Sequence, residues 1–222
     1  MAPQSSLIYD LPAVTVRRIA VSEMSNNVYL LTAKKSGIQV LIDAADDAAA
    51  IRGMINEATG DTPCSPRLHA VLTTHQHWDH IRALPEVAQD SAAELAAGQD
   101  DAAAIERETN LSIDRRLGHG ETVQYDGMAL DVIHLSGHTP GSVAFVYPVE
   151  DGPTHIFTGD SLFPGGVGKT WNETDFSQLI DDVETRIFAV YDDDTIIHPG
   201  HGDPTTLGAE RPQLPQWRER GW

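Results

Sequence analysis

A short segment of the chain, residues 74–80, concentrates side chains that bind metal ions. It reads Thr-His-Gln-His-Trp-Asp-His, so three imidazoles and one carboxylate stand close together. Three further candidates lie downstream among glycines and turn residues, and these are His138, Asp160 and His201. Five imidazoles and two carboxylates are the inventory of a centre that holds two metal ions and activates water. The sequence therefore indicates metal-dependent chemistry.

The spacing within this segment predicts how its ligands divide. Residues 68–73 are mostly apolar, and several are β-branched, which predicts a buried strand. His75 and His77 follow its end two positions apart, so an extended backbone places both on one side. Asp79 and His80 begin a predicted helix, where they point elsewhere and can serve a second ion. Histidine and carboxylate without thiolate suit zinc, and they also suit iron or manganese.

Other histidines and one aspartate have simpler interpretations. A lone histidine on an apolar strand is usually a hydrogen-bonded core residue, which is our interpretation of His69, His134, His155 and His198, while His119 reads as a loop residue. Asp43 ends a predicted strand. It could cap the helix that follows, or it could hold a ligand histidine in place, and the sequence leaves both roles open.

The order of these motifs resembles a known family. The pattern H-x-H-x-D-H at 75–80, followed by an isolated His, Asp and His, resembles the metallo-β-lactamase superfamily. The phrases His-Thr-Pro-Gly-Ser at 138–142, Phe-Thr-Gly-Asp-Ser-Leu-Phe at 157–163 and Pro-Gly-His-Gly at 199–202 resemble its glyoxalase II-like branch. The resemblance covers nearly the whole chain and implies a four-layer αββα sandwich with its ligands on loops at one edge.

The resemblance also implies a ligand set. Two divalent ions are expected, zinc by ligand type, with iron or manganese as alternatives. Three side chains hold each ion: His75, His77 and His138 hold the first, and Asp79, His80 and His201 hold the second. Asp160 bridges both ions. Ions in such centres lie about 3.5–4 Å apart and share a water whose pKa falls to about 7. The hydroxide would attack an acyl carbonyl, with Asp79 and Asp160 as the catalytic carboxylates.

Several activities are known on this fold, and the resemblance favours a thioesterase. Persulfide dioxygenases are the redox alternative, because they hold one iron with residues that match His75, His138 and Asp160. Lactonase and β-lactamase activities rank lower: acyl-homoserine lactonases carry a tyrosine where this chain has Phe163, and secreted β-lactamases carry a signal peptide. A non-enzymatic metal-binding module ranks last, since structural zinc sites close their coordination with thiolates.

The resemblance involves fewer residues for substrate binding than for metal binding. Lys169 and Trp171 stand where glyoxalase II has a lysine and a tyrosine near its substrate, so both are candidate substrate-binding residues; an ordinary exposed lysine is the alternative. The glycine-rich run 165–170 lacks the spacing of a phosphate loop. Only residues 203–222, with one short predicted helix, follow His201, so the resemblance does not include the C-terminal domain with which glyoxalase II binds glutathione. The resemblance therefore does not imply glutathione specificity, and it leaves open a smaller thioester or the conjugate of another thiol.

Composition limits the remaining classes. The chain has 222 residues and a net charge of −18, which argues against nucleic acid as a substrate. Its one cysteine, Cys64, excludes an internal disulfide. Residues 1–10 contain neither a basic region nor a long apolar stretch, so we expect no signal peptide, no membrane anchor and a cytoplasmic location. The partner is then a small-molecule substrate, and the sequence leaves the oligomeric state open.

Periodicity predicts the elements that position the ligands. We expect strands at 14–21, 27–33, 38–43, 121–125, 128–135, 142–147 and 154–158, with a hairpin at Asp126-Gly127. We expect helices at 46–59, 100–109 and 175–190, the last with an apolar stripe. Without repeats or linkers, residues 1–222 read as a single α/β domain.

Overall fold

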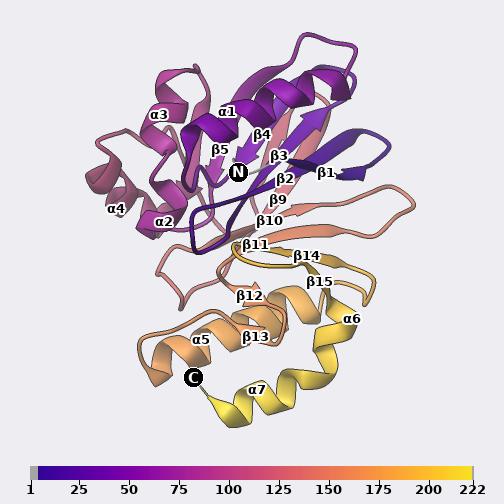
Figure 1. Ribbon diagram of the computed structural model, residues 1–222. Coiled ribbons are helices and arrows are strands. Elements are labelled where there is room, and N and C mark those ends of the chain that lie inside the picture. The colour runs from indigo at the N-terminus through magenta and orange to yellow at the C-terminus, as the bar shows by residue number, and fades with distance from the viewer. Residues whose placement is uncertain (1–4, 222) are drawn as a thin grey trace.

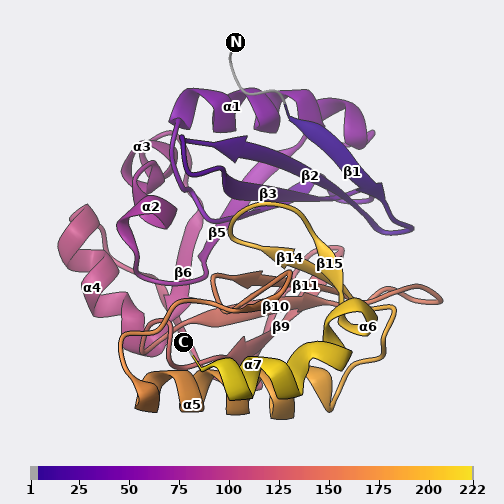
Figure 2. The ribbon, with the colours of Figure 1, turned by 60° about the horizontal axis from the view of Figure 1, so that its bottom comes forward.

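The computed structural model describes residues 5–221, and it shows two β-sheets packed face to face between outer helices (Figures 1 and 2). The predicted αββα architecture is confirmed. Residues 1–4, the start of the segment in which we expect no signal peptide, lie outside the described residues, as does residue 222. Among the described residues, no helix has the length and apolar character needed to cross a bilayer.

The first sheet combines antiparallel and parallel pairing. Its strands follow chain order, antiparallel up to the fourth and parallel beyond it. They are β1 (Ser6–Asp10), β2 (Val14–Val21), β3 (Asn26–Ala33), β4 (Ile38–Ile42), β5 (Arg67–Thr73), β6 (Glu94–Gly98) and β7 (Arg115–Leu117).

The second sheet has the order β15-β14-β11-β10-β9-β8, in which only the β11–β14 pair is parallel. Its strands are β8 (Thr122–Tyr125), β9 (Met128–His134), β10 (Val143–Tyr147), β11 (His155–Gly159), β14 (Ile196–Pro199) and β15 (Thr205–Thr206). A small hairpin, β12 (Leu162–Phe163) with β13 (Gly166–Val167), projects after β11.

Helices cover the outer face of each sheet. The first sheet is covered by α1 (Ala48–Glu57), α2 (Trp78–Ile81), α3 (Leu84–Gln89) and α4 (Gln99–Thr109). The second is covered by α5 (Glu173–Val183), α6 (Leu207–Glu210) and α7 (Leu214–Arg220). Shorter helical turns extend them: 3-10 turns at Ala58–Asp61 and Arg211–Gln213, and a π turn at Glu184–Phe188 that continues α5.

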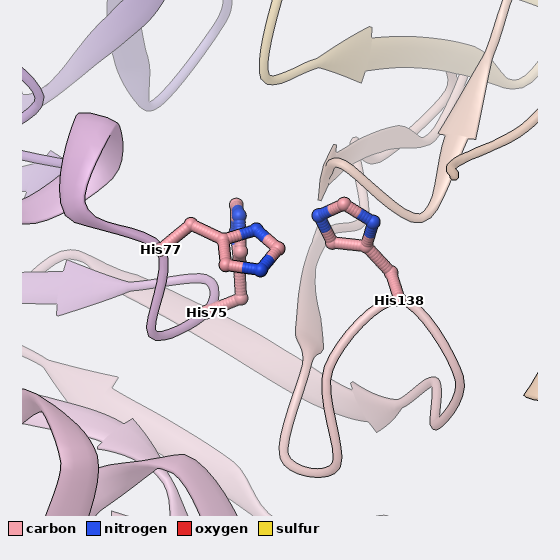
Figure 3. A group of neighbouring side chains, drawn as sticks. All are labelled: His75, His77 and His138. Atoms are coloured by element: carbon pink, nitrogen blue, oxygen red, sulfur yellow. The ribbon is translucent and has the colours of Figure 1, made fainter. Parts of the chain in front are cut away.

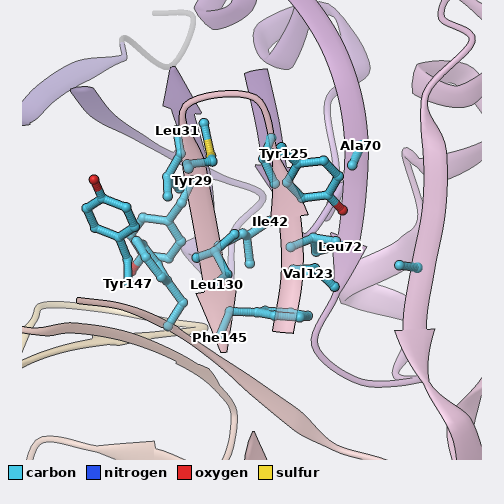
Figure 4. Close-up of a cluster of buried hydrophobic side chains, with 14 of the residues drawn as sticks. Tyr29, Leu31, Ile42, Ala70, Leu72, Val123, Tyr125, Leu130, Phe145 and Tyr147 are labelled. Carbon is cyan, nitrogen blue, oxygen red and sulfur yellow. The ribbon is translucent and has the colours of Figure 1, made fainter. Parts of the chain in front are cut away.

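Central strands are apolar on both faces because both faces are covered. On β3, Tyr29 and Leu31 face the other sheet, whereas Val28 and Leu30 pack against the helices. Side chains of both sheets interdigitate in the layer between them (Figure 4). The alternation that predicted these strands therefore separates the inner core from two outer cores.

The predicted elements agree with the structure apart from their ends and seven strands that were not predicted. The predicted hairpin at Asp126-Gly127 joins β8 to β9, and the apolar stripe of 175–190 packs as α5 and its π turn. The strands that were not predicted from the sequence are β1, β6, β7, β12, β13, β14 and β15. The expectation of one short helix in 203–222 was wrong: this region forms β15, α6, a 3-10 turn and α7.

Candidate metal centre

The seven candidate ligands lie at one edge of the sandwich, where strands of both sheets end. Residues 74–80 follow β5, Asp160 follows β11 and His201 follows β14. His138 lies in the connection between β9 and β10. The carboxyl ends of parallel strands meet at such an edge, which brings together side chains distant in the chain.

Three histidines form the first triad, defined as His75, His77 and His138. One nitrogen from each lies within 4.8 Å of the other two. The ring centroid of His138 is 4.9 Å from that of His75 and 4.6 Å from that of His77. Two loops carry these rings and present them to one another (Figure 3). His75 and His77, which the two-residue spacing places on one side of the backbone, therefore belong to the same triad.

The second triad, Asp79, His80 and His201, lies beside the first, and its ligand atoms also lie within 4.8 Å of one another. Asp160 stands between the triads. Its Oδ2 lies 3.8 Å from His138 Nε2 and 3.4 Å from His201 Nε2, and its Oδ1 lies 3.4 Å from His80 Nε2. The structure thus brings all seven predicted side chains together, with Asp160 in the position of a bridge.

Four of the five imidazoles are oriented by an acceptor at Nδ1. His80 Nδ1 lies 2.9 Å from Asp43 Oδ2, and His138 Nδ1 lies 2.7 Å from the carbonyl oxygen of Lys169. His201 Nδ1 lies 2.9 Å from a main-chain carbonyl oxygen, that of Met24. A ring that donates from Nδ1 keeps the Nε2 lone pair for a metal ion.

The fourth ring is reached through a hydroxyl. Thr74 Oγ1 donates to Asp43 Oδ2 at 2.8 Å and lies 3.0 Å from His75 Nδ1, so it accepts the proton of that ring. Asp43 therefore holds His80 directly and His75 through Thr74. Its backbone has φ 58°, a left-handed conformation that aspartate tolerates. The structure decides between the two roles left open by the sequence, because Asp47 caps α1 instead.

We expect Asp43→Asn to weaken metal binding at the second triad. The amide can accept on one side only, so Thr74 N–H, Thr74 Oγ1 or His80 Nδ1 must lose its acceptor. Loss of such a partner typically lowers metal affinity about 10- to 100-fold. Chelator competition measures the change, with Asp47→Asn as control, because asparagine caps a helix as well as aspartate does. Equal affinities in the two variants would contradict this role of Asp43.

The donor set fits divalent ions. His75 Nε2, His138 Nε2 and Asp160 Oδ1 are buried and have no hydrogen-bond partner within the described part of the chain. Buried polar atoms are rarely left unpaired, and these three belong to one cluster. A third group of neighbouring donors, Asp43 with His75 and His80, is not a separate site, because Asp43 is occupied by hydrogen bonds.

The two triads differ in charge. In the first triad, burial and the neighbouring His138 lower the pKa of His77 to about 4, and burial holds the pKa of His75 well below its usual value. In the second triad, burial alone would lower the pKa of His80 and His201. Asp160 and Asp43 outweigh burial at His80, and Asp160 and Asp79 outweigh it at His201. These carboxylates raise the pKa of both histidines to about 10.

These pKa values predict different pH dependences for the two sites. At pH 7 the first triad is neutral and binds its ion without releasing protons. A group whose pKa is raised to about 10 is protonated at pH 7, so an ion at the second triad must displace protons from His80 and His201. We expect proton release with one of the two ions, and higher affinity as pH rises. Calorimetry in buffers of different ionisation enthalpy measures this, and pH-independent binding of both ions would contradict it.

The sequence did not reveal every side chain that shapes the centre. Asn26 donates from Nδ2 to Asp79 Oδ2 at 2.9 Å and to the Asp79 carbonyl oxygen at 3.0 Å. Asn26 is fully buried at the start of β3, and its backbone forms an isolated bridge with His201. Its buried amide holds the second triad from the side of the first sheet. A polar pair, Asn26-Asn27, opening an apolar strand was the only sequence signal.

The two candidate substrate residues lie beside the centre and not within it. Lys169 Nζ stacks 4.6 Å from the centre of the Trp171 ring, and both side chains are exposed. Lys169 touches the centre through its carbonyl oxygen, which binds His138. A cavity of about 640 Å³ lies beside Lys169, and residues 163–169, Arg220 and Gly221 line it. The glycine-rich run 165–170 therefore forms a wall next to the metal centre.

The family model described as "Metallo-beta-lactamase superfamily" matches residues 21–201, which include all seven candidate ligands. The chain belongs to the metallo-beta-lactamase superfamily. Its match to hydroxyacylglutathione hydrolase GloC of Haemophilus influenzae is 34% identical over 163 residues, covering 67% of this chain and 75% of that protein. A hydroxyacylglutathione hydrolase of Jannaschia sp. is 34% identical over 149 residues, and the chain matches 52% of its length, about half. The predicted resemblance to the glyoxalase II-like branch is confirmed.

Solved structures of the superfamily with different titles share the fold. BLEG-1 B3 metallo-beta-lactamase has a TM-score of 0.72 and 26% identity, covering 90% of this chain and 98% of that one. ETHE1 from Myxococcus xanthus has a TM-score of 0.74 and 25% identity, covering 90% and 83%. A protein solved in a di-iron-bound form has a TM-score of 0.65 and 29% identity, covering 87% and 96%. The superfamily fold implies divalent metal ions, and the hydrolases among the relatives of this chain act on small molecules.

Proposed function

We propose that this chain is a two-metal hydrolase that cleaves thioesters. One observation carries the proposal: two triads of ligand atoms flank Asp160, and buried lone pairs in this cluster lack partners. The hydroxyacylglutathione hydrolases among its relatives, at 34% identity, favour a thioester over the other bonds that the superfamily cleaves. The proposed site consists of the two triads and Asp160.

The roles of the residues follow from their contacts. The first triad would hold one ion, the second triad the other, and Asp160 would contact both. Bound there, the ions supply a water that is deprotonated near neutral pH and a Lewis acid for the carbonyl oxygen. The neighbouring imidazoles of His201 and His80 outweigh burial and keep the pKa of Asp160 well below its usual value, so its carboxylate is ionised. Asp79, fixed by Asn26, would accept a hydrogen bond from the water and orient it.

The substrate would enter beside the glycine-rich wall. The cavity there has apolar side chains in Phe163 and Val167 and cationic ones in Lys169 and Arg220. The ring of Phe163 lies 6.4 Å from that of His201, which places the cavity next to the second triad. We propose that Lys169 and Trp171 border the thiol portion of the substrate, where a stacked cation and an indole ring offer a polar and an apolar contact.

A substrate panel tests this function. Purified protein is assayed with thioesters of one acyl group on glutathione and on smaller thiols, with an acyl-homoserine lactone and with a β-lactam. We expect the highest kcat/KM for a thioester and loss of that activity after chelation. Turnover of the lactone or lactam without turnover of any thioester would overturn the proposal.

One observation favours a second candidate, a persulfide dioxygenase with a single iron. The unpartnered buried atoms of His75, His138 and Asp160 belong to the residues that such an enzyme uses. Counting ligands does not separate the two candidates, and the hydroxyacylglutathione hydrolases among the relatives favour the hydrolase. Oxygen uptake on a thiol persulfide separates the two candidates. Zinc as the native metal, a cytoplasmic location and a single domain over 1–222 remain predictions.

A further inference from the structure

A buried carboxylate outside the seven candidate ligands contacts both loops of the first triad. Asp101 lies in the first turn of α4, and its side chain is fully buried. Its Oδ2 accepts from the backbone N–H of Gln76 at 2.9 Å and from the hydroxyl of Thr139 at 2.6 Å. Its Oδ1 accepts from the backbone N–H of Gly141 at 2.7 Å. Gln76 separates two histidines of the first triad, and Thr139 directly follows the third.

The two loops joined by Asp101 belong to different sheets. The loop 74–77 continues β5 of the first sheet, and the loop 135–142 connects β9 and β10 of the second. At their bases, the backbone N–H of Val143 donates to the carbonyl oxygen of Thr74 at 2.8 Å. Nearer their tips, Asp101 supplies three further hydrogen bonds. Because the Asp101 carboxylate bonds to both loops, it limits the distance between the ring of His138 and the rings of His75 and His77, which Figure 3 shows facing one another.

Local packing is shaped around this contact. A Cβ at Gly141 would overlap the backbone N of Asp101 and come within 2.8 Å of the carbonyl carbon of Asp100. Only glycine lets the loop approach α4 closely enough for its N–H to reach the carboxylate. Within residues 5–221, no hydrogen bond of Asp101 reaches the second triad. Asp43, by contrast, binds His80 of that triad directly.

We propose that Asp101 is a positioning residue that sets the spacing of the first triad and thereby the affinity of that triad for its metal ion. The inference rests on the proposed two-metal function. Fixed loops present three imidazoles at one separation, so binding does not have to order them. Without the carboxylate, the loops of the two sheets are tied only at their bases, and the facing rings can move apart.

The test is Asp101→Asn. An amide accepts on one side only, so in either orientation the N–H of Gln76 or of Gly141 faces another donor. We expect about 10- to 100-fold weaker binding of one ion and a change below about threefold for the other. Chelator competition with elemental counting measures both affinities. Cobalt(II) absorption identifies the weakened site, because a site with three histidines and a site with two histidines and a further carboxylate differ in spectrum.

The matched control is Asp100→Asn, which changes the same charge in the same helical turn at an exposed position. We expect it to bind both ions as the wild type does. Thr139→Val is a second, milder variant for the case that Asp101→Asn does not fold, with a loss of about fivefold at the same site. Equal weakening of both ions, or none, would overturn the positioning role. A wild-type protein that binds no pair of ions would instead overturn the proposed function.

Discussion

Asp160→Ala is expected to lose at least one metal ion and nearly all hydrolytic turnover. Asp160 lies within 3.8 Å of the Nε2 atoms of His138 and His201 and within 3.4 Å of that of His80, so the substitution removes a contact to both proposed ions. Removing one stabilising polar group from an active site costs about 10²- to 10³-fold in kcat. Loss of a bridge should exceed this, and we expect kcat/KM to fall at least about a thousandfold. Steady-state kinetics and elemental analysis on the same preparation measure both effects.

Asp194→Ala is the control for this variant, because Asp194 is an exposed carboxylate in a loop away from the centre. It should keep two ions and wild-type rates. An Asp160→Ala protein that hydrolyses its substrate at the wild-type rate would contradict the bridging position of this carboxylate, whatever its metal content.

Gly200→Ala is expected to have the second largest effect. A Cβ at Gly200 would overlap Asp160 Oδ1 and come within 2.8 Å of His80 Cε1. The added methyl group must displace the bridging carboxylate or a histidine of the second triad, although it removes no ligand. We expect kcat/KM to fall about a hundredfold or more, beyond the upper end of what loss of an outer hydrogen-bond partner costs.

Gly53→Ala in α1 is the matched control for this glycine. Nothing lies within 4 Å of the position its Cβ would take. It should leave kinetics unchanged and raise the free energy of unfolding by about 0.5–1 kcal/mol, since alanine is the better helix former. A Gly200→Ala variant with unchanged kcat/KM would show that Asp160 does not need the space next to Gly200.

The ligand cluster was predictable because its pattern is local. His75 and His77 follow an apolar strand at a two-residue spacing, and that strand end delivers both to one side. Asp160 and His201 stand in short glycine-containing phrases at strand ends. Their convergence depends on a topology that the sequence indicated only through its family resemblance, because β14, the strand before His201, was not predicted.

Asp101 shows why the supporting residues were harder to find. It shares the first turn of an alanine-rich, charged helix with Asp100, and the sequence gives the two carboxylates the same surroundings. One is fully buried and the other exposed, because the loop 139–141 reaches only Asp101. The hydrogen bond from Gly141 to Asp101 joins residues 40 positions apart, and a contact at this separation leaves no periodic pattern in the sequence.

The unpredicted strands have a similar explanation. Strand β6, Glu-Leu-Ala-Ala-Gly, has a composition that favours a helix, and it is extended because it pairs with β5 on one side and β7 on the other. β7 has three residues, too few for an alternation to be recognised. The C-terminal region packs through Trp217, which is buried in the outer core beside α5. Tertiary contacts, more than local propensity, determine these segments.

The most direct test counts the metal ions in purified protein and follows thioester hydrolysis as they are removed and returned. We expect two divalent ions per chain, loss of hydrolysis when a chelator removes them, and recovery when they are restored. A single iron per chain with oxygen uptake on a thiol persulfide would contradict the two-metal hydrolase. Thioester hydrolysis that survives complete removal of the ions would contradict it as well.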